Sequence, residues 1–292
     1  MKWYVLRVVV IVLSGFFAAA AALGGDLADV KKAGVLRHLA IPYANFVTGS
    51  GDGMDVEIIE LFARHLGVRY EYVKSDWGTV IEDLVGREVT IRGDNVEFGR
   101  PVPARGDLIA SGFTMLPWRQ KVVDFSSPTF PSQIWLVARA DSSMKPIRPS
   151  GNSGKDVSVT RALIRGKKVL ALPKTCLDPQ GNRLDETGAD VVIFDGSLNE
   201  IAPALVNNRA ELSILDAPDS IISLEKWPGK IKIIGPASGR QLMGVAFTKE
   251  SPNLKTAFND FFRKIRKDGT YDRIVKKYYP TAAFHFPEFF KK

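Results

Sequence analysis

Cysteine and histidine are scarce in this chain of 292 residues. With Cys176 as the only cysteine, no intramolecular disulfide can form. His38, His65 and His285 are far apart and lack metal-ligand spacing, so we expect no structural or catalytic metal site. Phosphate-binding glycine loops and recognisable nucleophile–histidine combinations are missing too. The sequence therefore predicts neither a cofactor nor a catalytic residue.

Long runs of one charge are also missing. Lys and Arg number 40 and Asp and Glu 32, a formal charge of +8, but the two signs are interspersed. Nucleic-acid binding therefore has little support. Hydrophobic residues make up 45% and charged residues 25%, as in ordinary globular proteins, and the length suggests about two domains.

One long apolar run lies at the N-terminus. Lys2 and Arg7 precede the apolar stretch Val8 to Phe17, and small residues from Ala18 to Ala22 offer cleavage sites. This pattern is typical of a secretory signal peptide, which we place at residues 1–24. A membrane span needs about 20 apolar residues, so an uncleaved anchor is the less favoured alternative. No cysteine lies near the cleavage region, so we do not expect a lipoprotein.

Short apolar strands alternate with helices along the rest of the chain. The segment Met54 to Leu66 has apolar residues at helical spacing and acidic residues in its first turn. Strands are also predicted at residues 169–172, 191–194, 212–215 and 231–234, with helices at 198–206 and 220–227. This alternation predicts βαβ units, in which ligands bind beyond the carboxyl ends of the strands.

The stretch Gly106 to Pro128 carries the clearest chemical signal. A short apolar strand ends there in Ser111 and Gly112, and Thr114 and Arg119 follow. Small residues let backbone N–H groups approach a ligand, a hydroxyl adds a donor, and a guanidinium can bind a carboxylate through two hydrogen bonds. These residues form a candidate anion site, and an ordinary strand end with a surface arginine is the alternative.

This stretch resembles the AGMTxTxxR…VDFSxPY motif of the family 3 extracellular solute-binding proteins, periplasmic receptors for amino acids and related polar solutes. Residues 267–280 resemble the closing xDGTYxxIxxKY motif of the same family. The resemblance covers the chain after the signal peptide, except residues 87–105 and 140–159. Residues 140–159 are polar and rich in Ser, Gly and Pro, which predicts an irregular segment.

The resemblance implies the two-lobed α/β fold of type II periplasmic binding proteins, with two mixed, mostly parallel sheets joined by two crossover strands. Lobe 1 would comprise residues 26–135 plus 246–292, and lobe 2 residues 136–245. Residues 87–105 depart from the family pattern and read as a β-hairpin inserted in lobe 1.

Ionic ligand contacts follow from the same resemblance. Arg119 would bind the α-carboxylate of the ligand. The remaining donors of this cradle would be Ser111, Gly112 and Thr114. Asp216 ends the segment NNRAELSILD, which matches AGRxDAxxxD, whose last residue binds the α-ammonium group. A helix cap is the alternative role for Asp216.

Four further ligand contacts are implied by position. Tyr43 and Trp77 would be aromatic walls of the cleft, although either ring could instead pack in the core. Thr175 and Cys176 match a GT(T/S) ligand loop, with Lys174 standing where glycine is usual. Cys176 could also be a small buried filler.

These resemblances imply a monomeric periplasmic protein without enzymatic activity. It would close over a carboxylate-bearing solute, most simply an amino acid, and present it to an inner-membrane ABC permease. One alternative is an input protein for a periplasmic sensor kinase or chemoreceptor. Another is an enzyme resembling the cyclohexadienyl dehydratases, which would need an acid to protonate a leaving hydroxyl. No second carboxylate is evident in the site motifs. Membrane-bound lytic transglycosylases also carry such a module.

Overall fold

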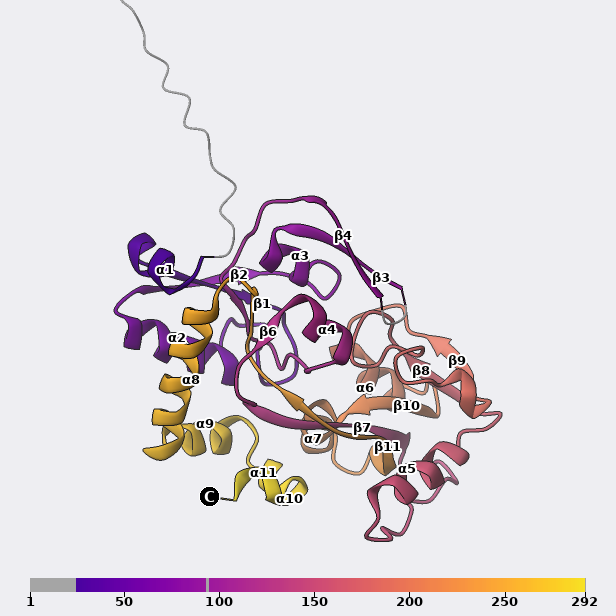
Figure 1. Ribbon diagram of the computed structural model, residues 1–292. Helices are drawn as coiled ribbons and strands as arrows, with labels where there is room; N and C mark the ends of the chain where they lie inside the picture. The colour runs from indigo at the N-terminus through magenta and orange to yellow at the C-terminus, as the bar shows by residue number, and fades with distance from the viewer. Residues whose placement is uncertain (1–24, 93–94, 292) are drawn as a thin grey trace, which may run out of the picture.

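The strands pair mainly into two mixed five-stranded sheets, as Figure 1 shows for this computed structural model. The structure describes residues 25–92 and 95–291. The predicted signal peptide, residues 1–24, lies outside the described residues. Over the residues that are described, no helix combines the length and apolar character needed to cross a membrane.

The first sheet gathers strands from both halves of the chain. Its strands, in the order in which they pair, are β2 (Arg69–Lys74), β1 (Val35–Ala40), β5 (Leu108–Ile109), β12 (Ala246–Phe247) and β6 (Asp124–Phe125). β1 pairs in parallel with β2 and β5, whereas β12 pairs antiparallel with β5 and β6. The helices on this side are α1 (Leu27–Ala33), α2 (Met54–Leu66), α3 (Val80–Val85), α4 (Pro117–Val122), α8 (Pro252–Lys267) and α9 (Thr270–Tyr278).

The second sheet is built from the middle of the chain. Its strands, in pairing order, are β11 (Ile231–Met243), β7 (Phe130–Arg139), β10 (Leu212–Asp216), β8 (Lys168–Ala171) and β9 (Asp190–Ile193). Its helical segments are α5 (Ser153–Ala162), η1 (Asp185–Thr187), α6 (Leu198–Val206) and α7 (Ala217–Lys226). β7 follows β6 and β11 leads into β12, so this antiparallel pair carries the chain between the sheets.

Two segments, a hairpin and the last turns of the chain, lie outside this two-sheet plan. β3 (Arg87–Arg92) and β4 (Asn95–Pro101) pair antiparallel as a separate hairpin, where a hairpin was expected. The last turns of the chain form α10 (Ala282–His285) and α11 (Pro287–Phe290). Residues 140–159 are not wholly irregular, because α5 begins within them. The side chain of Asn152 accepts a hydrogen bond from the Lys155 N–H at 3.0 Å and caps this helix.

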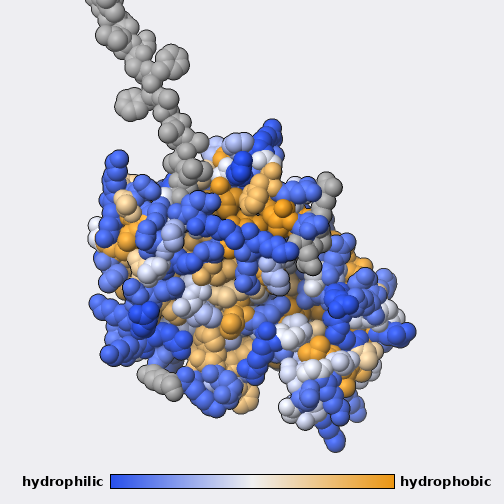
Figure 2. All heavy atoms as spheres, viewed as in Figure 1, coloured by the Kyte–Doolittle hydropathy of each residue, from blue (hydrophilic) through white to orange (hydrophobic). Residues whose placement is uncertain are grey.

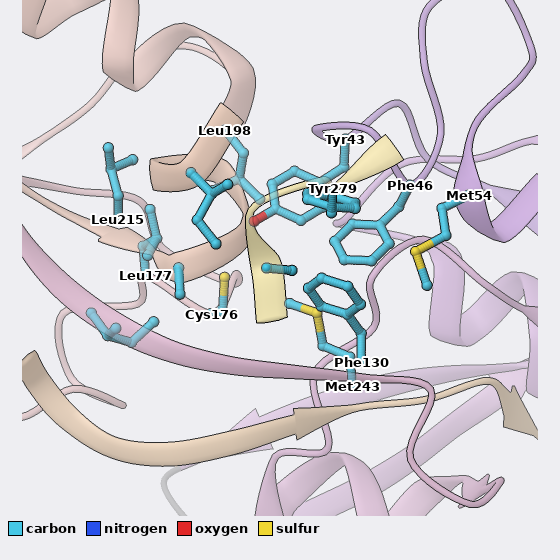
Figure 3. Close-up of a cluster of buried hydrophobic side chains, with 14 of the residues drawn as sticks. Tyr43, Phe46, Met54, Phe130, Cys176, Leu177, Leu198, Leu215, Met243 and Tyr279 are labelled. Carbon is cyan, nitrogen blue, oxygen red and sulfur yellow. The ribbon is translucent and has the colours of Figure 1, made fainter. Parts of the chain in front are cut away.

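Apolar side chains from both sheets meet in one continuous core. Figure 3 shows the rings of Tyr43, Phe46 and Tyr279 close together, with Leu198 next to Tyr43 and Leu215 farther away in the same cluster. The centroids of Phe46 and Tyr279 are 5.0 Å apart, at a tilt typical of aromatic pairs. On the face seen in Figure 2, hydrophilic side chains dominate and hydrophobic ones are most concentrated near α3. The core therefore continues across the junction of the two sheets.

A buried ion pair ties the start of β5 to β1. Asp107 precedes β5, and its carboxylate accepts hydrogen bonds from the Arg37 backbone N–H at 2.8 Å and from Arg37 Nη2 at 2.6 Å. Asp107 is buried, whereas the Arg37 side chain is partly exposed. Since both a backbone donor and a guanidinium depend on this carboxylate, removing it leaves two groups unsatisfied.

We therefore expect Asp107→Ala to lower the free energy of unfolding by about 2–3 kcal/mol, measured by urea denaturation. Asp141→Ala is the matched control, because Asp141 pairs with Arg139 at 2.7 Å on the exposed surface and should change stability little. Equal losses in the two variants would contradict this assignment.

Candidate functional site

Arg119 lies in α4 and is buried, with only 2% of the residue exposed. Its guanidinium carbon is 4.0 Å from the ring centroid of Phe113, 5.2 Å from that of Trp118 and 5.8 Å from that of Trp77. Nη1 donates a hydrogen bond to the Thr114 carbonyl oxygen at 3.1 Å. Nε is buried without a partner among the described residues, and none of their carboxylates forms an ion pair with Arg119.

The unpaired guanidinium is held at a cost. A buried charge is unfavourable unless it is paired, and burial lowers the pKa of Arg119 to about 10. The three ring faces offset part of this cost through cation–π attraction. Among the described residues, Nε has no acceptor and is open to one from a ligand. An anion with a planar pair of oxygens, such as a carboxylate, suits this group.

Asp216 occupies two roles at once. It is the last residue of β10 and the N-cap of α7, where its Oδ1 accepts a hydrogen bond from the Asp219 N–H at 3.2 Å. Its Oδ2 lies 3.7 Å from Cys176 Sγ, and the Tyr43 side chain lies near the same carboxylate. Burial raises the pKa of Asp216 above its ordinary value. The cap expected as an alternative is present, and the carboxylate also faces Tyr43 and Cys176.

Cys176 connects the cationic and anionic sides of the cluster. Its thiol is buried, and burial together with Asp216 raises its pKa well above the ordinary value, so it is neutral at pH 7. The charge of Arg119 acts on the same sulfur. The structure therefore brings Arg119, Cys176, Asp216 and Tyr43 into one neighbourhood, although they come from both sheets.

A loop from the first sheet and a helix from the second hold this neighbourhood shut. Tyr43 lies after β1, and its ring centroid is 5.6 Å from that of Trp77. Asn199 in α6 donates from Nδ2 to the Pro42 carbonyl oxygen at 3.1 Å and accepts from the Ala44 N–H at 2.9 Å. The site is consequently enclosed rather than open to solvent in this structure.

Two expected carboxylate donors are engaged by the protein itself. Ser111 Oγ accepts from the Ile41 N–H at 2.9 Å and donates to the Ala110 carbonyl oxygen at 2.7 Å. The Gly112 N–H donates to Asp55 Oδ2 at 2.7 Å. Gly112 has φ +60°, and an added Cβ would lie 2.4 Å from the Phe46 ring, so only glycine fits this corner. Their contact with a ligand stays a prediction.

In the loop after β8, the hydroxyl of Thr175 is likewise hydrogen-bonded within the protein. Thr175 Oγ1 donates to the Leu172 carbonyl oxygen at 2.7 Å and accepts from the Leu177 N–H at 3.0 Å. Lys174 has φ +61°, in the left-handed region that favours glycine. This conformation explains why glycine is usual at this position in relatives, and nothing in the structure explains why this chain has a lysine instead. The role of Thr175 as a ligand contact also stays a prediction.

Three residues of the site were not anticipated from the sequence. Phe113 and Trp118 flank the predicted anion motif and pack on Arg119. Asp219 lies in the first turn of α7, is 6% exposed, and its Oδ2 has no partner among the residues described. The spacing Asp-x-x-Asp after a strand was the available signal, because it places both acids in the same cap.

The comparison with known proteins decides the family. Residues 103–281 match the sequence profile of the bacterial extracellular solute-binding proteins, family 3. The chain belongs to this family. It is 24% identical over 231 residues to the L-cystine-binding protein TcyJ of Escherichia coli strain K12, covering 79% of this chain and 75% of that protein. Its fold matches solved structures of type II periplasmic amino-acid-binding proteins, as expected from the sequence.

The similar proteins include both a binding protein and an enzyme. A mutant of ArgBP from T. maritima superposes with a TM-score of 0.68 and 26% identity, covering 87% of this chain and 99% of that one. Membrane-bound lytic murein transglycosylase F of Desulfosudis oleivorans is 25% identical over 228 residues. The match covers 78% of this chain but 44% of the transglycosylase, so the chain spans less than half the length of this relative.

We expect Arg119→Met to leave the fold intact and to raise the free energy of unfolding of the ligand-free protein by about 1–2 kcal/mol at pH 7. The variant replaces an unpaired buried cation with an apolar side chain of similar length. Arg37→Met, which removes a guanidinium that is paired with Asp107, should instead be destabilising. Urea denaturation of both variants tests the contrast, and a loss of stability in Arg119→Met would contradict it.

The buried Asp55 predicts a distinct pH dependence. Burial raises its pKa from 3.8 to about 7, so its contribution to stability is fully present below pH 4 and is lost as the pH rises to 7. Relative to Asp55→Asn, the wild type should therefore lose about 2 kcal/mol of stability between pH 5 and pH 8. The measurement is denaturation of both proteins at both pH values. A parallel pH response would refute it, and Asp185→Asn on the surface serves as the control.

Proposed function

We propose that this chain is a periplasmic solute-binding protein for a small zwitterion, most simply a free L-amino acid, which it captures for an ABC transporter. The Nε of the buried Arg119 carries the proposal: it has no partner among the described residues, and a buried guanidinium with an open donor favours an anionic ligand. Asp216 supplies the complementary charge for an ammonium group. Cys176, which lies beside Asp216 and feels the charge of Arg119, marks the space between them.

In this proposal the two sheets belong to separate lobes. Lobe 1 comprises residues 26–135 plus 246–292, and lobe 2 residues 136–245. The ligand binds Arg119 on lobe 1 first, and closure about β7 and β11 then brings Asp216 and Cys176 onto it. The hydrogen bonds between Asn199 and the loop at Pro42 would stabilise the closed form. Since the ligand contacts both lobes only when closed, its binding energy favours closure.

The relatives agree with an amino acid as the solute. Their names specify L-cystine, histidine and arginine as ligands. Each of these compounds carries an α-carboxylate and an α-ammonium group, which are the two groups that Arg119 and Asp216 complement. Export to the periplasm fits the predicted signal peptide. An ABC permease is the simplest recipient of the bound solute, and a sensor protein is the alternative.

One observation supports the dehydratase alternative. Asp219 supplies the second buried carboxylate that the motifs did not reveal. An ancestral amino acid-binding protein described as a precursor of cyclohexadienyl dehydratase shares the fold, with a TM-score of 0.66 and 22% identity. Because catalysis would require proton transfer to a bound substrate, turnover of prephenate by the purified chain would favour this class over a receptor.

Titration calorimetry with L-arginine, L-histidine, L-cystine and L-glutamine tests the proposal, with putrescine as an amine that lacks a carboxylate. We expect at least one amino acid to bind and putrescine not to bind. Arg119→Ala should weaken binding by 100-fold or more, because it removes one partner of a buried charge pair. Arg119→Lys keeps the charge but loses the planar guanidinium, so its affinity should lie between those of the wild type and Arg119→Ala.

Arg139→Ala is the matched control, since Arg139 lies at the far end of β7 and pairs with Asp141 instead. Its affinity should equal that of the wild type. Binding that survives Arg119→Ala would refute the carboxylate clamp. Absence of binding for every amino acid tested would refute an amino-acid receptor.

A further inference from the structure

Asp219 is a buried acid that the fold does not need as a cap. Asp216 already caps α7 through the Asp219 backbone N–H, which leaves the Asp219 side chain without a role in the helix end. Its Oδ2 is inaccessible to solvent and has no hydrogen-bond donor in the part of the chain that the structure describes. A buried acceptor without a donor is costly, and natural structures hold few of them.

The groups around Asp219 do not neutralise it. Its titratable or charged neighbours are Tyr43, Cys176, Asp216, Lys226 and Tyr279. Burial raises the pKa values of both tyrosines and of the thiol, so these three are uncharged at pH 7. Asp216 has the same sign when ionised. Lys226 lies exposed in the last turn of α7 and forms no ion pair with Asp219 in the described structure.

The missing partner is therefore a cation that the described residues do not supply. An ammonium group has three N–H donors and needs several acceptors when it is buried. Asp216 is already partly engaged, because Oδ1 accepts from the Asp219 N–H at 3.2 Å and Oδ2 lies 3.7 Å from Cys176 Sγ, so a second acid nearby helps to satisfy the three donors. Asp219 Oδ2, one helical turn along and close to Tyr43 and the same thiol, is the acceptor still unused.

We propose that Asp219 is a second ligand-binding carboxylate, which together with Asp216 forms a two-acid site for the cationic amine of the solute. This inference rests on the proposed function and names the group that the site selects. Two acids facing one amine favour primary ammonium ligands over analogues in which the amine is lost or acetylated. Without a ligand, the close carboxylates repel each other when both are ionised, which favours retention of a proton between them.

Calorimetry on the full mature chain tests the assignment with two matched pairs of probes. L-arginine is compared with 5-guanidinopentanoate, and L-glutamine with 4-carbamoylbutanoate, in which hydrogen replaces the α-ammonium group. Asp219→Asn should weaken binding of the amino acids at least ten-fold and change the affinity for their deaminated partners less than two-fold. Asp185→Asn, an exposed acid in η1, should leave all four affinities unchanged.

A second readout does not depend on the ligand. Because Asp219→Asn removes a buried carboxyl group whose Oδ2 has no hydrogen-bond partner among the described residues, the ligand-free variant should have a Tm equal to or a few degrees above that of the wild type. Asp219→Ala provides the same test should the asparagine variant fold poorly. A lowered Tm with unchanged amino-acid affinity would show a structural residue and overturn the inference.

The outcomes separate the inference from the proposed function. If the wild type binds an amino acid and Asp219→Asn binds it equally well, Asp219 is not a ligand contact, and the receptor assignment stands. An equal loss for an amino acid and its deaminated partner would likewise overturn selection of the amine. If the wild type binds none of these four probes and neither L-histidine nor L-cystine, the proposed function and this inference fall together.

Discussion

The site depends on charge that is buried without its counter-charge. Arg119 contacts three aromatic rings, yet its Nε meets no acceptor among the residues that the structure describes, and Asp219 Oδ2 is buried there without a donor. By contrast, the buried carboxylate of Asp107 forms an ion pair with Arg37. The unpaired groups are concentrated where both sheets meet, and one zwitterionic solute with separated charges would satisfy both. Unsatisfied buried groups of this kind are typical of binding sites, because their unfavourable free energy is relieved when a ligand pairs with them.

The fold creates this arrangement by bringing two strand ends together. Arg119 follows the end of β5 in the first sheet, and Asp216 ends β10 in the second. Since both sheets are joined by β7 and β11, the polar residues beyond these strand ends converge at one junction. The aromatic residues around the junction exclude water, which strengthens the electrostatic attraction for a bound ion. Specificity then depends on few polar groups within an apolar enclosure.

Local patterns predicted most of the strands, the helix at α2 and the hairpin, because periodicity and turn residues act over short distances. Arg119 and Asp216 followed from motifs of known spacing. No motif predicted that Ser111 Oγ and the Gly112 N–H would form hydrogen bonds within the protein, since their partners are about 60–70 residues away in the chain. The burial of Asp219 likewise arises from tertiary packing. α5 was missed because its sequence is polar and only the cap at Asn152 signals it.

A crystal structure of the chain with the amino acid that binds it most tightly tests the central claim most directly. The account predicts a carboxylate oxygen of the ligand within hydrogen-bonding distance of Arg119 Nε, with the ligand enclosed between the two sheets. A ligand bound elsewhere, or a bound carboxylate that leaves Arg119 Nε without an acceptor, would contradict the account.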